Sequence, residues 1–226
     1  DHTFYEEISD KIMQILRGYA DLFEQVGIDE AYLDITKKAQ GNFEEARDLA
    51  QKVKEEVKNQ QKITCSIGIG PNKLVAKIAA ENQKPEGLTT IEPEEATGFL
   101  FSLPVNRLIG VGRKIAEKME ILGIKTIGDL AKYDAQRLVE VFGKKLGVYF
   151  HEAANGKDDS LVQEAGETES ISRISTLKEN TRDLELILKK TNQLSEEIHQ
   201  ELTQRSLSFK EVGIIAVMAD MSIRSR

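Results

Sequence analysis

The chain has 226 residues, of which 40% are hydrophobic and 31% are charged, and this composition excludes a disordered protein. No apolar run reaches the roughly 18 residues of a transmembrane helix and no signal peptide is present, so we expect a cytoplasmic protein without a membrane partner. The net charge of −7 argues against a nucleic-acid partner unless the basic residues are clustered.

The first elements that the sequence predicts are an amphipathic helix and a hairpin. Apolar residues recur at helical spacing from Tyr5 to Tyr19, which indicates a helix with one buried face. Two short apolar strands then flank Asp29 and Glu30 within the segment 26–35. Because successive side chains of a strand point to opposite faces, both acids reach one site only if the chain turns between the strands. We therefore expect a hairpin whose tip exposes two carboxylates.

Two interpretations of this acidic tip are open from spacing alone. Carboxylate oxygens suit hard divalent cations, and Mg²⁺ takes one or two of them and completes its shell with water or phosphate oxygens. Alternatively, the tip is an ordinary turn that water solvates, since acidic residues are common in turns.

The next segment predicts helices that alternate with short strands. Asn42 is a suitable N-cap for an amphipathic helix. A β-branched strand over 63–69 follows, then a helix that we expect to open at Pro71 and to end before Pro85, and then a strand over 87–91. Together with the hairpin, these elements indicate a mixed sheet with helices.

The rest of the chain changes character twice. Residues 93–155 predict short helices joined by glycine turns, with no strand pattern, and residues 156–169 are polar and rich in turn-forming residues, as in a linker. The remainder predicts a strand over 171–177, a long helix over 182–205 and a strand over 212–221. Two strands are too few for a stable sheet, so we expect this last domain to be incomplete. The fold class is therefore α+β, in several domains.

Three segments, in this order, resemble the Y family of DNA polymerases, which bypass lesions. The run Gly27-Ile-Asp-Glu-Ala-Tyr-Leu-Asp34 is similar to the catalytic motif of the family's palm domain, in which Ser usually stands where this chain has Gly27. The second segment is Ser66-Ile-Gly-Ile-Gly-Pro-Asn-Lys-Leu-Val-Ala-Lys-Ile-Ala80 with Lys84-Pro-Glu-Gly87, and the third is Leu108-Ile-Gly-Val-Gly-Arg-Lys-Ile-Ala116. The resemblance is to the middle of a family member of the DNA polymerase IV-like type.

This resemblance implies template-directed DNA synthesis. The reaction transfers a deoxynucleoside monophosphate to a primer 3′ end, so the implied partners are primer-template DNA and deoxynucleoside triphosphates, with a sliding clamp left open. Asp29 and Glu30 would be catalytic and hold two Mg²⁺ ions. Lys84 would contact the triphosphate of the nucleotide, although a solvated lysine at a helix end is its alternative role. The same two roles are open for Lys73 and Lys77.

A DNA-backbone surface is implied as well. The third segment looks like the hairpin of a helix-hairpin-helix motif, in which Gly110 and Gly112 leave amides free to face a phosphate and Arg113 and Lys114 lie beside them. Such contacts bind DNA without reading its sequence. A plain connector between helices is the alternative, and a second, poorer copy over 142–147 stays open in the same way.

The resemblance divides the chain into a palm at 1–92, an all-helical thumb at 93–155, a linker at 156–169 and part of a little finger at 170–226. In the little finger, Arg173 would lie along the template backbone. A family member also has a first palm strand, a fingers domain and the other half of the little finger, which this sequence lacks. We therefore expect the chain alone to be inactive.

Two rival functions use the same residues differently. In a non-catalytic helix-hairpin-helix DNA-binding protein, Asp29 and Glu30 would be relics. A palm-like nucleotidyl cyclase shares the paired acids and two metals, but it has no need of the glycine hairpin.

Overall fold

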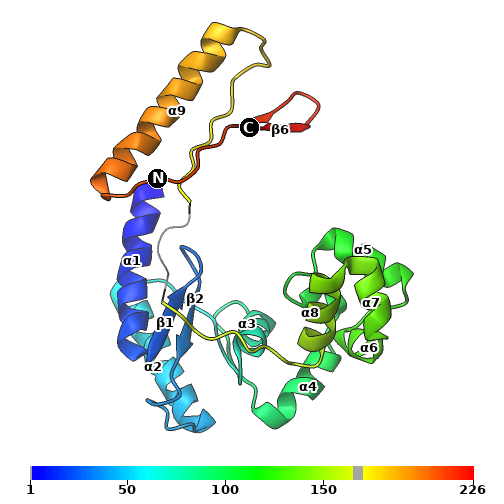
Figure 1. The fold of residues 1–226 in the computed structure, drawn as a ribbon. Coiled ribbons are helices and arrows are strands. Elements are labelled where there is room, and N and C mark those ends of the chain that lie inside the picture. Colours follow the sequence, from blue (N-terminus) through cyan, green and yellow to red (C-terminus); the bar gives the residue numbers. More distant parts are fainter. Residues whose placement is uncertain (1, 165–169) are drawn as a thin grey trace. The chain divides into compact units, whose positions relative to one another are not determined.

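The computed structural model describes residues 2–164 and 170–226, and the chain divides into two compact units, Asp1–Gly166 and Glu167–Arg226 (Figure 1). Helices and small two-stranded sheets are both present in it, so the prediction of a chain with both helices and strands is confirmed. Over the described part of the chain, no helix combines the length and apolar character needed to cross a membrane.

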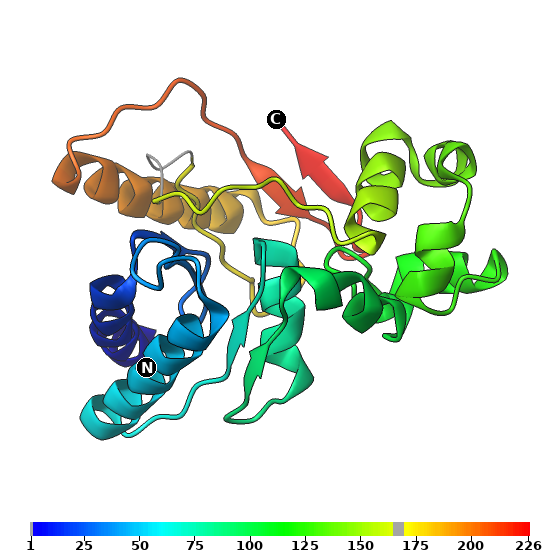
Figure 2. The same ribbon diagram turned by 90° about the horizontal axis from the view of Figure 1, so that it is seen from below.

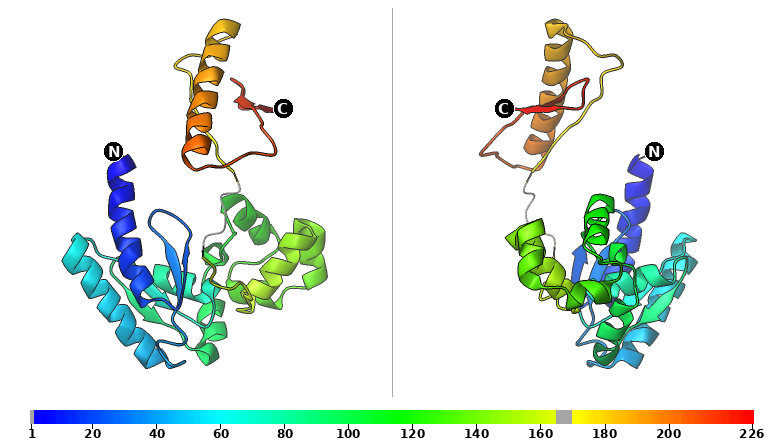
Figure 3. Two further views of the ribbon diagram at one scale, coloured as in Figure 1. Left: turned by 60° about the vertical axis from the view of Figure 1, so that its left-hand side comes forward. Right: turned by 90° about the vertical axis from the view of Figure 1, so that its right-hand side faces the viewer.

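A helix and a hairpin open the first unit. They comprise α1 (His2–Tyr19), β1 (Leu22–Gln25) and β2 (Ala31–Asp34). The two strands are antiparallel, with Leu22 opposite Asp34 and Gln25 opposite Ala31. Both views of Figure 3 show α1 alongside this hairpin, whose tip is the predicted turn.

A β-α-β unit follows a long helix. The elements are α2 (Phe43–Gln61), β3 (Ile67–Ile69), α3 (Lys73–Asn82) and β4 (Leu88–Thr90). Asn42 caps α2 as predicted, because its side chain accepts from the N–H groups of Glu44 and Glu45. The start predicted for α3 at Pro71 was wrong: the side chain of Asn72 accepts from Val75 N over 3.0 Å and fixes the first turn there.

The sheet prediction for this part holds only in a coarser form. β3 and β4 pair in parallel, and β1 and β2 pair in antiparallel fashion, so both strand orientations are present. Among the described residues, however, these are separate two-stranded sheets. The strand predicted over 63–69 is also shorter, because only Ile67–Ile69 faces a partner strand, and Cys65 before it is half-buried.

Short helices make up the rest of the first unit and share one core with α3. They are α4 (Pro93–Phe101), η1 (Val105–Arg107), α5 (Arg113–Ile121), α6 (Ile127–Lys132), α7 (Ala135–Phe142) and α8 (Lys144–Ala154). Leu100, Leu130 and Phe150 are fully buried in this core, together with Val75 and Ile78 of α3. Figure 2 shows these helices as one group that follows the β-α-β unit.

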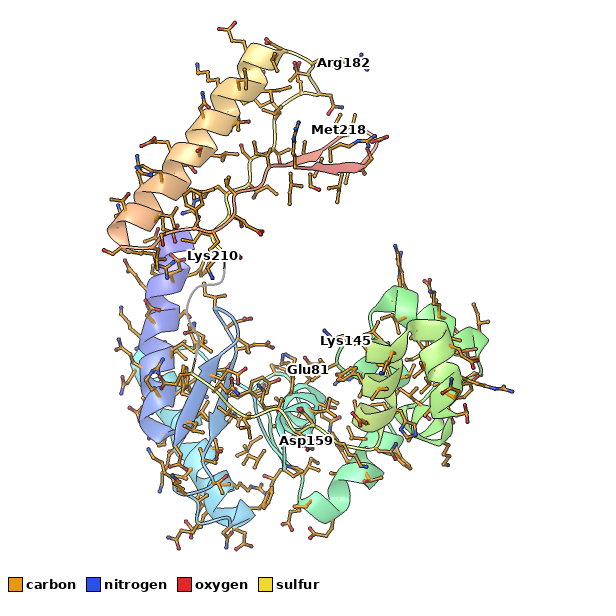
Figure 4. All side chains as sticks on the ribbon, in the orientation of Figure 1. Glu81, Lys145, Asp159, Arg182, Lys210 and Met218 are labelled. Atoms are coloured by element: carbon orange, nitrogen blue, oxygen red, sulfur yellow. The ribbon has the colours of Figure 1, made fainter. Side chains whose placement is uncertain are left out.

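The segment after α8 lies against α3. The side-chain amide of Asn72 donates to the carbonyl of Gly156 over 2.8 Å, and the carboxylate of Asp158 accepts from Leu74 N over 3.0 Å. Figure 4 labels the neighbouring Asp159 in this stretch over α3. The first part of the predicted linker is thus hydrogen-bonded to the unit it follows, and its residues 165–169 lie outside the described residues.

In the second unit, a helix is followed by a hairpin. The elements are α9 (Leu184–Gln204), β5 (Ile215–Val217) and β6 (Ile223–Ser225), with Met218 labelled at the turn in Figure 4. The helix predicted over 182–205 is confirmed. The β-α-β prediction was wrong: residues 171–177 form no strand, because their backbone groups find no partner strand, and 212–221 bends into the hairpin instead.

Candidate functional site

The acidic tip is a turn that is open to water. The N–H groups of Val26 and Gly27 both donate to the carbonyl of Glu30, over 3.0 and 3.2 Å, and close the turn between β1 and β2. Asp29 and Glu30 are exposed on it. The predicted turn between the two strands is therefore confirmed. The role of the two acids as metal ligands stays a prediction.

Helix α3 presents two lysines to the hairpin. The Lys77 ammonium donates to both carboxylate oxygens of Glu30, over 2.9 and 2.8 Å. One helical turn earlier, the Lys73 ammonium donates to both oxygens of Glu24 on β1, over 2.9 and 2.7 Å. Residues four apart lie on one face of a helix. Two ion pairs from that face consequently hold the hairpin against α3.

The two ion pairs have a tyrosine beside them. Tyr32 is the cross-strand partner of Glu24, and its ring centroid lies 5.0 Å from the Lys73 ammonium. Burial raises the pKa of Tyr32 to about 12, with further contributions from nearby carboxylates, of which Glu30 is the first and Asp158 the second. Tyr32 is therefore a neutral hydroxyl at physiological pH.

Glu24 is ionised and held from two directions. Burial by itself raises its pKa, but the hydrogen bonds from Lys73 and from the N–H of Gln163 favour the carboxylate, and the net pKa is lowered. Its side chain is only 20% exposed. This carboxylate therefore has two structural partners, whereas the carboxylate of Glu30 accepts from Lys77 alone among the described residues.

Lys84 lies in the turn between α3 and β4. Its side chain is exposed, and its ammonium has no hydrogen bond or ion pair within the described ranges. Lys54 of α2 stabilises this turn, because its ammonium donates to the carbonyls of Cys65 and Glu86, both over 2.7 Å. Lys58 adds an ion pair with Glu86 over 2.8 Å. The turn is thus braced while Lys84 is available to an anion, and nucleotide binding stays a prediction.

The glycine hairpin at 108–112 leads into α5. Gly110 has a φ of +85°, a conformation that favours glycine. Gly112 is the N-cap of α5 and has no side chain to satisfy the first N–H groups of the helix. Arg113 and Lys114 form the exposed start of the helix. Amides at a helix start beside two cations suit a phosphate, and the DNA-binding role of these residues stays a prediction.

A second helix, α8, also starts at a glycine that has no side-chain cap. Gly143 has a φ of +83° and precedes α8 without a side-chain cap. Lys144 and Lys145 follow it and are exposed; Figure 4 labels Lys145. The possible second copy of the hairpin over 142–147 therefore shares with the first an uncapped glycine followed by two basic residues. Its N-cap glycine itself has the positive φ, whereas the N-cap Gly112 of α5 has a φ of −77°.

Arg173, the predicted DNA contact in the second unit, is engaged within that unit. Its guanidinium donates to the carboxylate of Glu201 on α9 and lies 4.0 Å from that of Glu197. The arginine is 37% exposed at its side chain. A phosphate would have to compete with these two acids for the guanidinium, and the DNA contact of Arg173 stays a prediction.

Two positioning residues had no signal in the sequence. The Tyr149 hydroxyl donates to the carbonyl of Ile109 over 2.9 Å and holds the glycine hairpin from 40 positions away. Lys54 holds the Lys84 turn from 32 positions away at Glu86. Only the tertiary fold brings these pairs together, and no local pattern marks them.

The donor set at the acidic turn suits a Mg²⁺ ion that keeps most of its water. Two carboxylates are available, and the Lys77 ammonium on Glu30 demonstrates that a cation fits against that side chain. Residues 2–164 and 170–226 contain no group of three or more His, Cys, Asp or Glu that could hold a metal. Water or phosphate oxygens would therefore supply the other ligands.

Comparisons with known proteins agree with this geometry. Residues 1–81 match the impB/mucB/samB family, and residues 106–158 match the family described as "DNA polymerase-iota, thumb domain". DNA polymerase IV of Nitrosopumilus maritimus is 41% identical over 226 residues, which are 100% of this chain and 62% of the relative. DNA polymerase IV of Methanosarcina acetivorans is 44% identical over 220 residues, 95% of this chain and 60% of the relative. The chain spans about three fifths of the length of these curated relatives.

Solved structures give the same answer. A Y-family DNA polymerase chimera matches with a TM-score of 0.87 and 34% identity, over 100% of this chain and 64% of that chain. An insertion ternary complex of Dbh DNA polymerase matches with a TM-score of 0.73 and 34% identity, again over 100% and 64%. Fold and matches together define a homologue of DNA polymerases. The chain is homologous over its whole length to DNA polymerase IV, and its structural neighbours are DNA polymerases of the Y family.

Proposed function

We propose that this chain is part of a template-directed translesion DNA polymerase, in which 1–92 form the palm, 93–155 the thumb, 156–169 a linker and 170–226 part of the little finger. The observation that carries the proposal is the water-exposed turn with Asp29 and Glu30, placed beside the lysine face of α3 in a chain whose full length aligns with DNA polymerase IV.

In this proposal the acidic turn and the Lys84 turn act on the same substrate. Asp29 and Glu30 hold Mg²⁺, which, when bound, stabilises charge on the attacking and leaving oxygens of phosphoryl transfer. Lys84 extends its ammonium to the triphosphate of the incoming deoxynucleotide, and the brace from Lys54 keeps the Lys84 turn in place. Positioning of this kind matters because a displacement of about 1 Å can cost on the order of 100-fold in rate.

The DNA partner is proposed to lie against the helix starts. Amides at Gly110 and Gly112, with Arg113 and Lys114, would bind backbone phosphates of primer-template DNA, and Arg173 would add a contact from the second unit. These groups carry no base-reading pattern, so the binding would not depend on sequence. A sliding clamp is a further proposed partner.

A whole-enzyme chimera tests the proposal. Residues 1–226 replace the aligned part of the Nitrosopumilus maritimus DNA polymerase IV, and primer extension is measured with Mg²⁺ and four deoxynucleotides. Asp29→Asn should lower the extension rate about a thousandfold, since a lost metal ligand costs several kcal/mol of transition-state stabilisation. DNA binding should remain.

Asp34→Asn is the matched control. Asp34 is an acid on the same hairpin, but it accepts a hydrogen bond from Thr36 N over 2.8 Å and has a local structural role. The extension rate of this variant should stay within about fivefold of the parent, because only the hydrogen bonds of Asp34 with Thr36 are weakened. Undiminished extension by Asp29→Asn would contradict the catalytic assignment. A chimera that binds DNA without extending primers would favour the non-catalytic DNA-binding alternative.

A further inference from the structure

The ion pair of Lys77 with Glu30 places an ammonium on a carboxylate that is proposed to hold a metal. Both oxygens of Glu30 accept from Lys77, over 2.9 and 2.8 Å. The side chains remain 28% and 44% exposed, so water and small ions can reach the pair. Glu30 is thus in direct contact with a cation that belongs to the protein itself.

A divalent cation and this ammonium compete for the same oxygens. A metal bound to Glu30 would bring two positive charges within a few ångströms of Lys77, and the two cations would repel each other even in water. The lysine stem has four flexible carbons, so the ammonium can move away without a backbone change. Helix α3 itself stays in place, because Val75 and Ile78 on its other face are fully buried.

We propose that Lys77 is a built-in cation that occupies Glu30 until a divalent metal displaces it. The inference rests on the proposed function, because it takes Glu30 as a metal ligand, and it makes Lys77 a positioning residue rather than a catalytic one. Lys77 then keeps the acidic turn docked on α3 before the metal arrives. The ion pair also makes the affinity of the turn for a metal weaker than that of two carboxylates without a bound ammonium.

Lys73 differs from Lys77 in ways that make it a matched control. Its partner Glu24 also accepts from Gln163 N over 3.1 Å, and Lys73 itself also donates to the carbonyl of Leu161 over 3.3 Å. The Lys73 and Glu24 side chains are only 17% and 20% exposed. Within the part of the chain that the structure describes, Lys77 has Glu30 as its sole hydrogen-bonding partner. Lys73 therefore has a structural role, whereas Lys77 binds one carboxylate that a metal can take over.

The experiment is a titration of the 226-residue chain with Mn²⁺, used as the probe for Mg²⁺, in which electron paramagnetic resonance reports the free ion. Lys77→Met should tighten Mn²⁺ binding about three- to tenfold, because the competing positive charge is gone. Lys77→Arg keeps the charge and should bind within about twofold of the parent. Lys73→Met should also change the affinity by no more than about twofold, because its charge is not on Glu30. Circular dichroism confirms that each variant is folded.

The remaining outcomes separate this inference from the proposed function. Glu30→Gln should weaken Mn²⁺ binding, and no change there would contradict the metal site itself. If Glu30→Gln weakens binding while Lys77→Met leaves it unchanged, the metal site stands and the role of Lys77 is refuted. Equal tightening by Lys77→Met and Lys73→Met also refutes it, because a general field rather than occupation of Glu30 would then be the cause.

Discussion

The hydroxyl of Tyr149 donates a hydrogen bond to the carbonyl of Ile109 over 2.9 Å, and the tyrosine ring passes close to Gly110. One side chain of α8 therefore braces the hairpin that precedes α5. The two glycine-started helices of this unit are consequently coupled: the element that would carry one phosphate site also fixes the backbone of the other.

Removal of this brace should loosen the hairpin. Tyr149→Phe leaves the carbonyl of Ile109 without its donor, which should cost about 1 kcal/mol of folding stability. Affinity for duplex DNA should fall about threefold for every sequence, since phosphate contacts carry no base readout. Thermal unfolding and fluorescence anisotropy measure the two effects. The control is Tyr133→Phe, because the Tyr133 hydroxyl has no protein partner among the described residues and both quantities should stay unchanged.

The two hairpin glycines should respond differently to substitution. Gly110→Val forces a β-branched residue to a φ of +85°, at a cost of about 1–2 kcal/mol, and should weaken DNA binding alike for all sequences. Gly112 has a φ of −77° and open space around it, so the Gly112→Val variant should fold normally. It should weaken DNA binding only because the valine side chain covers the N–H groups at the start of α5. Binding titrations on several duplexes test this, and a loss limited to some sequences would mean base readout.

Tyr32 should titrate late. Because its folded pKa is about 12 and above the unfolded value of 10.0, the folded state retains the proton longer. Stability from this group is therefore full below pH 10 and is lost as the pH rises toward 12. The difference between the absorbance titrations of the parent and of Tyr32→Phe measures this pKa among the five tyrosines of the chain. Glu30→Gln removes one of the raising charges and should lower it, whereas Glu140→Gln on α7 should not.

The chain alone should not extend primers. Its acidic turn offers two carboxylates, and no larger metal-binding group occurs in the residues that the structure describes. Mg²⁺ bound there would keep most of its water, so a second ion lacks a firm seat. A primer-extension assay on the 226-residue chain, beside the chimera as a positive control, decides the matter. Clear template-directed extension would contradict the expectation.

The second unit should associate with itself. Ile215, Val217 and Ile223 of its hairpin are more than half exposed, and a two-stranded sheet leaves both edges unpaired. Size measurement over a range of concentrations should reveal larger species, and Val217→Lys should reduce them. A monomer at every concentration would show that these edges are harmless.

Local patterns predicted the elements whose causes are local. Asn42 caps α2 through its own side chain, and the buried positions of α3 follow from helical spacing. The acidic turn was found because two acids interrupt an apolar run. The exposed position of Asp29 follows from the turn.

Features that depend on distant partners escaped prediction. Lys77 lies 47 positions from Glu30, and either role considered for it from the sequence left it unpaired in the protein. The strand predicted over 171–177 had suitable residues, yet a strand exists only where another strand completes its hydrogen bonds. The ion pair of Arg173 was missed for a similar reason, because Glu201 on α9 comes next to it only in the folded unit.

The core that α3 shares with α4–α8 limits how relatives can be recombined. Val75 and Ile78 touch the same buried cluster as Leu100 and Phe150, although α3 lies in a different predicted domain from those two residues. A crossover between α3 and α4 would therefore join the two halves of one interior from different parents. The buried side chains from the two parents would not be matched in volume. Overpacking of this kind typically costs about 1–3 kcal/mol of folding stability. A crossover near Gly166 cuts neither buried cluster and is the natural place to exchange modules.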